Sequence, residues 1–379
     1  MDTPLKVLTV VGNRPQFIKA AAVSPGLRAR GQELLVHTGQ HFDDELSAVF
    51  FAELGLPAPD VQLDISGGSN SSQTARMLAA LEPVIAEAAP DCVLVYGDTN
   101  STLAGALAAV QQEVPVAHVE AGMRSYDRSM PEEVNRVLTD HLSALLLCSS
   151  GLAAANLAAE GIGSSGGARA GGTESDNSAV AVVGDVMVDI ALQVQPRARA
   201  RVDLVREHGV EPGHYLLATA HRAGNVDDPV RLEALVGLLL GVGEQVVLPL
   251  HPRTHARMEA AGLLERLVNG GRVRVTRPLG YVELTALMCN ARAVLTDSGG
   301  LQKEAYLAGV PCVTLRPSTE WVETVEAGWN VLVDLDLEAA RTALVAPPPS
   351  ARPELYGDGR AGERVVAALA SATANKLPC

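Results

Sequence analysis

This chain has few aromatic side chains and no long apolar runs, and its net charge is negative. Aromatics make up 3% of its 379 residues and the formal net charge is −14. A nucleic-acid-binding face needs stacking platforms and cations, so none is expected. No apolar run reaches the roughly 18 residues of a membrane helix, and the opening MDTPLKVLTVVGNRP has no signal-peptide pattern. We therefore expect a cytoplasmic protein with no membrane and no nucleic-acid partner.

Cysteines and nucleotide-binding fingerprints are also limited. The five cysteines are odd in number, and four lie in or beside apolar runs without metal-type spacing. This pattern predicts reduced, buried thiols and no metal. No segment matches the G-x-G-x-x-G dinucleotide fingerprint or the Walker phosphate loop. The missing dinucleotide fingerprint argues against chemistry that passes through NAD.

Short apolar runs, in contrast, recur along the whole chain and alternate with Ala- and Leu-rich stretches. Apolar residues make up 47% of the sequence. Runs of continuous hydrophobicity are typical of parallel strands that helices cover on both faces. The length suits two domains, so we predict an α/β protein of two Rossmann-like, doubly wound domains. The runs are KVLTVVG, LLVHTG, CVLVYGD, VPVAHVEAG, LLLCSS, AVAVVGD, YLLATAHR, QVVLPLH, VRVTRPLG, AVLTDSGG and PCVTLR.

The predicted domain limits follow from composition. Residues 161–178 are rich in Gly, Ser and Ala and are predicted to be a flexible surface loop. We place the first domain at 1–186 and the second at 187–358. The remaining 359–379 contain the helix-like GERVVAALASATA, which could pack back on the first domain.

Polar side chains end several apolar runs of the first domain, where doubly wound sheets bind their ligands. Arg14 and Lys19 follow the first run and suit a phosphate. Asp98 ends VYGD, and Glu120 ends HVE. Surface exposure accounts for Arg14 and Lys19 when each is taken alone. An N-cap explains one of the four polar residues Asp98, Thr99, Asn100 and Ser101, but not all four.

The stretch VPVAHVEAGMRSYDRSMPEEVNR is unusually rich in charge. If Glu120 and Asp98 share one crevice and Glu132 arrives from the next helix start, like charges would leave an acid and a base side by side at neutral pH. The structural alternative pairs each glutamate with Arg124 or Arg136. We assign Glu133 to that structural role and keep the other three acids as catalytic candidates.

The second domain offers a comparable set of strand-end residues. His221 and Arg222 end one strand, and His251 with Arg253 ends another, which favours anion binding modestly over a structural role. In LTDSGGLQKEA a strand passes through two glycines into a helix, and a helix start can hold a phosphate. Capping by Asp or Ser is the alternative reading there. The candidates in this motif are Ser298, Gly299, Gly300 and Glu304.

Seven collinear motifs together resemble the non-hydrolysing UDP-N-acetylglucosamine 2-epimerases. They are GNRPQFIKAA, HTGQHFD, VYGDTNSTLAG, HVEAGMRS, MPEEVNR, TAHRAGN and DSGGLQKEA, and they extend from about Lys6 to Asp334. The resemblance implies two domains facing a central cleft, as in B-type glycosyltransferases, with UDP held mainly by the second. It also implies a UDP-amino sugar as substrate, no cofactor, and a homodimer.

The resemblance assigns a role to each matched residue. Asp98, Glu120, Glu132 and His221 would carry the chemistry. The candidate substrate-binding residues are Arg14, Lys19, Arg136, Arg222, His251, Ser298, Gly299, Gly300, Glu304 and Arg316.

Several positions depart from the commonest family pattern. Gln16 stands where R-P-E is typical, Gly224 where H-R-x-E-N is typical, and Leu284 where an aromatic residue often meets uracil. Trp321 replaces an arginine that usually meets phosphate. These changes resemble a sub-group that acts on UDP-2,3-diacetamido uronic acids. Asp43 replaces a glutamine of the family's regulatory site, so allostery is not assumed.

The implied reaction is inversion at C2, a carbon with no neighbouring carbonyl. Expelling UDP first makes the C2 proton acidic and gives a glycal, and UDP then adds back with a proton delivered to the opposite face. This route needs cations at the diphosphate and an acid/base group on each face of the sugar. The alternatives are a UDP-sugar glycosyltransferase of the same fold, a hydrolytic relative, and a sugar-nucleotide sensor without turnover.

Overall fold

The computed structural model describes residues 5–40, 53–163 and 179–374. The chain divides into two compact units: unit 1 comprises Met1–Ile190 with Tyr356–Cys379, and unit 2 comprises Ala191–Leu355. The division falls inside helix α7 (Val186–Arg199). The expected loop at 161–178 lies, from 164 onward, outside the described residues, as does Asp43.

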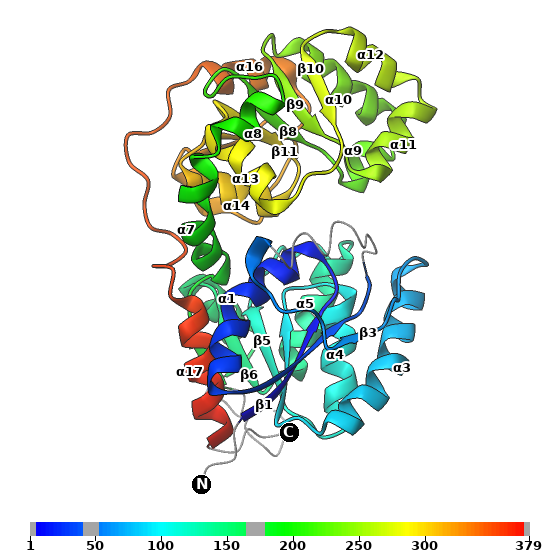
Figure 1. Ribbon diagram of the computed structural model, residues 1–379, viewed down its shortest axis with the longest axis vertical. Helices are drawn as coiled ribbons and strands as arrows, with labels where there is room; N and C mark the ends of the chain where they lie inside the picture. Colours follow the sequence, from blue (N-terminus) through cyan, green and yellow to red (C-terminus); the bar gives the residue numbers. More distant parts are fainter. Residues whose placement is uncertain (1–4, 41–52, 164–178, 375–379) are drawn as a thin grey trace. The chain divides into compact units, whose positions relative to one another are not determined.

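Unit 1 is built on a seven-stranded parallel sheet in the order β3-β2-β1-β4-β5-β6-β7 (Figure 1). Its strands are β1 (Leu5–Val11), β2 (Gly31–His37), β3 (Val61–Gln62), β4 (Cys92–Tyr96), β5 (Val116–Ala121), β6 (Leu145–Cys148) and β7 (Ala179–Val182). Its helices are α1 (Arg14–Arg30), α3 (Asn70–Ala88), α4 (Asn100–Val110), α5 (Pro131–Leu142), α6 (Gly151–Ala159), the start of α7, and α17 (Ala361–Ala374).

Unit 2 has a six-stranded parallel sheet in the order β10-β9-β8-β11-β12-β13. Its strands are β8 (Leu216–Thr219), β9 (Val246–Pro249), β10 (Val273–Thr276), β11 (Ala293–Thr296), β12 (Cys312–Thr314) and β13 (Asn330–Leu332). Its helices are α8 (Val202–Glu207), α9 (Ala223–Val226), α10 (Pro229–Gly241), α11 (Pro252–Ala260), α12 (Leu263–Asn269), α13 (Tyr281–Asn290), α14 (Gly299–Ala308), α15 (Val322–Glu326) and α16 (Leu337–Val345). The prediction of two doubly wound α/β domains is confirmed.

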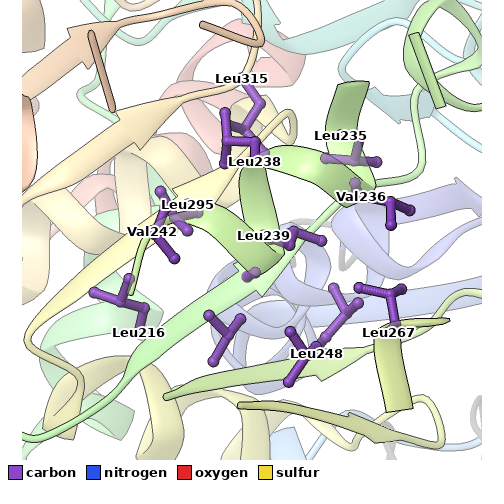
Figure 2. Packing of buried hydrophobic residues seen from close by; sticks show 14 of the residues in the cluster. Leu216, Leu235, Val236, Leu238, Leu239, Val242, Leu248, Leu267, Leu295 and Leu315 are labelled. Carbon is purple, nitrogen blue, oxygen red and sulfur yellow. The ribbon is translucent and has the colours of Figure 1, made fainter. Parts of the chain in front are cut away.

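The cores explain why the strand runs are apolar throughout. Val93, Val95 and Val116 of unit 1 are fully buried. In unit 2, Leu235 and Leu239 of α10 pack with leucines of the central strands, as Figure 2 shows. Because helices cover the sheet on both faces, polar side chains gather where the strands end.

Helix α17 belongs to unit 1 and packs on α1, beside which it runs in Figure 1. An added Cβ at Gly26 of α1 would lie 3.1 Å from Val366 of α17, so the two helices approach closely. Asp189 of α7 caps the start of α17, accepting hydrogen bonds from the backbone N–H groups of Ala361 at 3.0 Å and Gly362 at 2.7 Å. The last helix is thereby attached to unit 1 at its side and at its N-terminus.

Four cysteines lie in the described part of the chain, and all four are buried free thiols. Burial raises the pKa of Cys92 and Cys312 to about 12, so these thiols are protonated at neutral pH. The predicted burial of unpaired thiols is confirmed for all four. Among the described residues no helix is long and apolar enough to cross a membrane.

Candidate functional site

In unit 1, Asp98 and Glu120 lie at the carboxyl ends of β4 and β5, and each is paired with a cation, whereas Glu132 lies in the first turn of α5. Lys19 Nζ donates to Glu120 Oε2, and Arg136 Nη2 donates to Asp98 Oδ2. Arg136 also donates to Glu133 at 2.8 Å. The sequence analysis expected acids opposed mainly by one another. The structure instead alternates acids with cations, which offsets their repulsion.

Lys19 is held in its charged form by this arrangement. Burial alone would lower its pKa, but the charges of Glu120 and Asp98 raise the pKa above its usual value of 10.5. Burial likewise lowers the pKa of Arg136, while the charges and hydrogen bonds of Asp98 and Glu133 raise it overall. Unit 1 thus carries two permanent cations at the ends of its central strands.

Glu120 adopts a backbone conformation that glutamate seldom takes. Its φ is +72°, and the register of β5 against β6 shifts between Val119 and Ala121, which marks a β-bulge. Bulges and left-handed non-glycine residues cost energy and concentrate at functional sites, where they re-aim a side chain. At this irregular position the Glu120 carboxylate accepts a hydrogen bond from Lys19 Nζ.

Gly97, between β4 and Asp98, leaves room for this ion pair. Its φ is +64°, and an added Cβ would lie 3.0 Å from Lys19 Nζ and 3.1 Å from Glu120 Oε2. Any other residue would be strained and would crowd the pair. Asn135 of α5 donates to the Asp98 carbonyl oxygen at 3.0 Å, which ties the same turn to α5.

The two glutamates at the start of α5 have different surroundings, as the sequence analysis expected. Glu133 is buried and accepts hydrogen bonds at 2.9 Å from the backbone N–H groups of Ser125 and Tyr126, besides its bond from Arg136. Its structural role is therefore confirmed. Glu132 is half-buried, and no residue of the described ranges donates a hydrogen bond to its side chain.

Gln16 connects the loop before α1 to the turn that carries Asp98. Its Oε1 accepts from the Gly12 backbone N–H at 2.7 Å. Its Nε2 donates to the Tyr96 carbonyl oxygen at 2.8 Å and to Thr102 Oγ1 at 2.9 Å. The amide uses both its acceptor and its donor, so the departure from R-P-E is built into the hydrogen bonding of unit 1. Arg14, the first residue of α1, is half-buried.

In unit 2 the fully buried Asp297 organises the turn after β8. Its carboxylate accepts from the backbone N–H groups of His221 at 3.1 Å and Arg222 at 3.0 Å, and from Asn225 Nδ2 at 3.2 Å. His221 Nδ1 lies 3.6 Å from Asp297 Oδ1, and the His221 side chain is 43% exposed. A buried carboxylate therefore orients a histidine whose ring reaches solvent.

His251 lies beside His221, with ring centroids 6.1 Å apart. Its Nδ1 accepts from the Arg253 backbone N–H at 3.2 Å, so His251 is also the N-cap of α11. A proton on this ring therefore resides on Nε2.

Two candidate arginines meet one carboxylate near the glycine turn. Glu320 Oε2 accepts from Arg316 Nη1 at 2.9 Å, and Glu320 Oε1 lies 3.7 Å from Arg222 Nη2. An added Cβ at Gly299 would lie 2.3 Å from Glu320 Oε1, whereas one at Gly300 would meet only Ser298 Oγ, at 3.9 Å. A side chain at position 299 would thus displace Glu320 from its contacts with Arg316 and Arg222, whereas one at position 300 would meet almost nothing.

Helix α14 begins without a side-chain cap. Ser298 is its N-cap residue, yet the Ser298 side chain makes no capping hydrogen bond. A helix start of this kind retains backbone N–H groups that suit an anion. Glu304 lies one turn further on, is buried, and lies beside the buried Tyr281.

Trp321 makes a cation–π contact with a lysine of α14. Lys303 Nζ lies 4.3 Å from the centre of a Trp321 ring, and both side chains are buried. Where relatives are expected to have an arginine, α14 thus supplies a lysine stacked on an indole. Sequence reasoning quoted Lys303 within DSGGLQKEA without giving it a role, and it likewise missed Glu320 and His118.

The described ranges contain no group of three or more His, Cys, Asp or Glu residues placed to hold a metal ion. The positive charges of unit 1 and unit 2 come instead from the side chains of arginine and lysine.

Comparison with known proteins agrees with the motifs. A sequence model of the UDP-N-acetylglucosamine 2-epimerase family matches residues 27–370. The chain is 47% identical to the UDP-2,3-diacetamido-2,3-dideoxy-D-glucuronate 2-epimerase of Pseudomonas aeruginosa, over 97% of this chain and 99% of that protein.

Solved structures agree as well. The Methanocaldococcus jannaschii UDP-GlcNAc 2-epimerase in complex with UDP-GlcNAc and UDP has a TM-score of 0.87 and 37% identity, covering 97% of this chain and 100% of that one. The Neisseria meningitidis UDP-GlcNAc 2-epimerase bound to UDP-GlcNAc has a TM-score of 0.82 and 28% identity, covering 97% and 100%. This chain therefore belongs to the UDP-N-acetylglucosamine 2-epimerase family, whose members are isomerases.

Proposed function

We propose that this chain interconverts the C2 epimers of a UDP-linked 2-acetamido sugar without hydrolysing it. The observation that carries the proposal is the set of acids paired with Lys19 and Arg136 at the strand ends of unit 1. A reaction that removes and returns a carbon-bound proton needs acid/base groups at the sugar ring, whereas glycosyl transfer needs a base only at the acceptor hydroxyl.

In the proposed mechanism the C1–O bond breaks first, and its electron pair leaves with UDP. A base then takes the C2 proton, and the C–H electrons form the C1=C2 bond of a glycal. UDP adds back to C1 while an acid delivers a proton to the opposite face of C2. Asp98, Glu120 and Glu132 are our candidates for these proton transfers.

The diphosphate that leaves must be stabilised by positive charge. We assign this role to His221 and Arg222, which Asp297 orients through their backbone N–H groups, together with Arg316 and the uncapped start of α14 at Ser298. Glu304 would accept a hydrogen bond from the ribose. Arg14, Lys19, Arg136 and His251 complete the candidate substrate-binding set.

The two candidate substrates are UDP-N-acetylglucosamine and the UDP-linked diacetamido glucuronate, and the similarity to one relative favours the diacetamido sugar. UDP-N-acetylglucosamine is the substrate named for most of the relatives. The 47% identical Pseudomonas relative is named for the diacetamido glucuronate. Independently, Gln16, Gly224 and Trp321 depart from the commoner family pattern in the way that resembles the diacetamido sub-group.

Product analysis in deuterated water tests both the reaction and the substrate. The chain is incubated with each UDP-sugar alone, and the products are identified by mass and proton resonance. We expect a new UDP-sugar that carries deuterium at C2. Hydrogen retained at C2 would point to an internal hydride route, release of free sugar to a hydrolase, and a requirement for an acceptor to a glycosyltransferase.

We also propose that the chain works in the cytoplasm as a homodimer. The buried, unoxidised thiols suit a reducing compartment. Sedimentation of the purified protein tests the dimer.

A further inference from the structure

His118 is a fully buried side chain of β5 that contacts two hydrogen-bond acceptors. Its Nε2 lies 2.7 Å from the carbonyl oxygen of Gly97, and its Nδ1 lies 2.7 Å from Asp140 Oδ1. A carbonyl oxygen cannot donate, so the hydrogen bond to Gly97 requires a proton on Nε2. Whether Nδ1 also carries a proton depends on the state of Asp140.

Besides His118, the carboxyl group of Asp140 of α5 faces the Arg124 guanidinium and the Gly122 backbone N–H, and both favour its ionised form. Burial would raise its pKa, but the hydrogen bonds and charges of His118 and Arg124 lower the pKa below its usual value. Its other oxygen accepts from Arg124 Nη1 at 2.7 Å and from the Gly122 backbone N–H at 3.1 Å. A carboxylate in this state donates nothing, so the short contact to His118 requires a proton on Nδ1 as well.

The surrounding charges balance a doubly protonated imidazole. Arg124 is bound by Asp140 and, through two nitrogens at 2.7 Å each, by Glu160 at the end of α6. With His118 positive, the cluster holds two cations and two anions, which is the condition under which buried charges persist.

The group that His118 holds is the turn of the candidate active site. The Gly97 carbonyl belongs to the peptide that leads into Asp98, and Gly97 itself lies against the Lys19–Glu120 pair. Glu120 follows His118 by two residues and lies within the register shift between Val119 and Ala121. One buried ring therefore fixes the Asp98 turn relative to Glu120 and to α5, which carries Glu132 and Arg136.

We propose that His118 is a positioning residue whose ring donates a hydrogen bond from each nitrogen, and that its Nε2 proton holds the Gly97–Asp98 peptide in the orientation needed for proton transfer at C2. This inference rests on the proposed function for its catalytic part. Its structural part, the doubly protonated ring, does not depend on the substrate.

Nitrogen resonance of the full-length protein labelled with ¹⁵N-histidine tests the ring directly. Among the signals of the nine histidines, we expect that of His118 to show protons on both ring nitrogens at pH 8, and we expect this signal to vanish in a His118→Asn variant. If the spectrum at pH 8 contains only neutral imidazoles, the proposal is wrong, whatever the enzyme does.

Two matched substitutions test the positioning role. His118→Gln retains a donor near the Nε2 position, toward Gly97, and loses the one toward Asp140; His118→Asn does the reverse. Both remove the charge and one hydrogen bond. We expect His118→Asn to lower kcat roughly tenfold more than His118→Gln, with KM for the UDP-sugar changed less than about twofold in both.

Thermal unfolding of both variants separates positioning from folding. Equal kcat in the two variants, or kcat that follows their unfolding temperatures alone, contradicts the positioning role. If the parent protein converts no UDP-sugar at all, the proposed function fails, whereas the resonance result on His118 still decides the state of the ring.

Discussion

The hydrogen bonds of Gln16 make a sharp prediction about a Gln16→Glu substitution, which restores the commoner family residue. The Gln16 Nε2 group donates to the Tyr96 carbonyl oxygen at 2.8 Å. An ionised glutamate would bring an oxygen to that carbonyl in place of a donor. A protonated glutamate could still donate one hydrogen bond there, so the folded state favours the acid form and raises the pKa of the new carboxyl.

The sign of the pH dependence follows from this raised pKa. A group whose folded pKa lies above its unfolded value, about 4.3 for Glu, contributes stability that is present at low pH and lost as the pH rises through the folded pKa. Leaving a buried acceptor unsatisfied costs about 1–3 kcal/mol, and more when a charge is involved. We expect the variant to lose less than about 1 kcal/mol at pH 5 and roughly 2–4 kcal/mol at pH 8.

Urea unfolding followed by circular dichroism at the two pH values measures the loss. Gln16→Met is the matched control, because it removes the same hydrogen bonds without adding an acid, and its cost should not change with pH. Both tryptophans, Trp321 and Trp329, lie in unit 2, so their fluorescence reports on the unit that was not altered. An equal loss at pH 5 and pH 8 in Gln16→Glu would refute the reasoning.

Three further predictions concern residues of the two units. Glu120→Gln should lower turnover on the order of a hundredfold with little change in UDP-sugar binding, and full activity of this variant would remove Glu120 from the mechanism. Because the pKa of Lys19 is raised above 10.5, its ion pair stabilises the fold below that pH, and this stabilisation is lost as the pH rises through the folded pKa. The free energy of unfolding should therefore fall less at alkaline pH in a Lys19→Gln/Glu120→Gln double variant than in the parent protein. Gly299→Ala should cost about 1–3 kcal/mol in urea unfolding, because its Cβ meets Glu320 at 2.3 Å; Gly300→Ala, with open space, should be neutral, and equal losses would contradict the steric account.

The sequence predicted the two sheets and the strand-end positions of the candidate residues because hydrophobic runs and strand ends are local patterns. It did not predict the partners. Lys19 and Glu120 are 101 residues apart, and nothing in GNRPQFIKAA or HVEAGMRS indicates that they pair. Partners of this kind depend on sheet order, which places β4 between β1 and β5.

Backbone conformation was the second feature beyond sequence reasoning. Glutamate has no preference for positive φ, so the bulge at Glu120 could not be read from residue type. Glycine at 299 was assigned to a ligand's approach, whereas the structure gives it a second reason in Glu320. A steric contact of this kind can be recognised only when the positions of residues distant in sequence are known.

The return of α17 to unit 1 affects the order in which the protein can mature during synthesis. All of Ala191–Leu355 leaves the ribosome before the helix that covers α1 is made. Unit 2 can therefore fold while unit 1 still exposes the surface that Val365, Val366 and Leu369 later bury. A nascent chain of this design completes its first-synthesised part last.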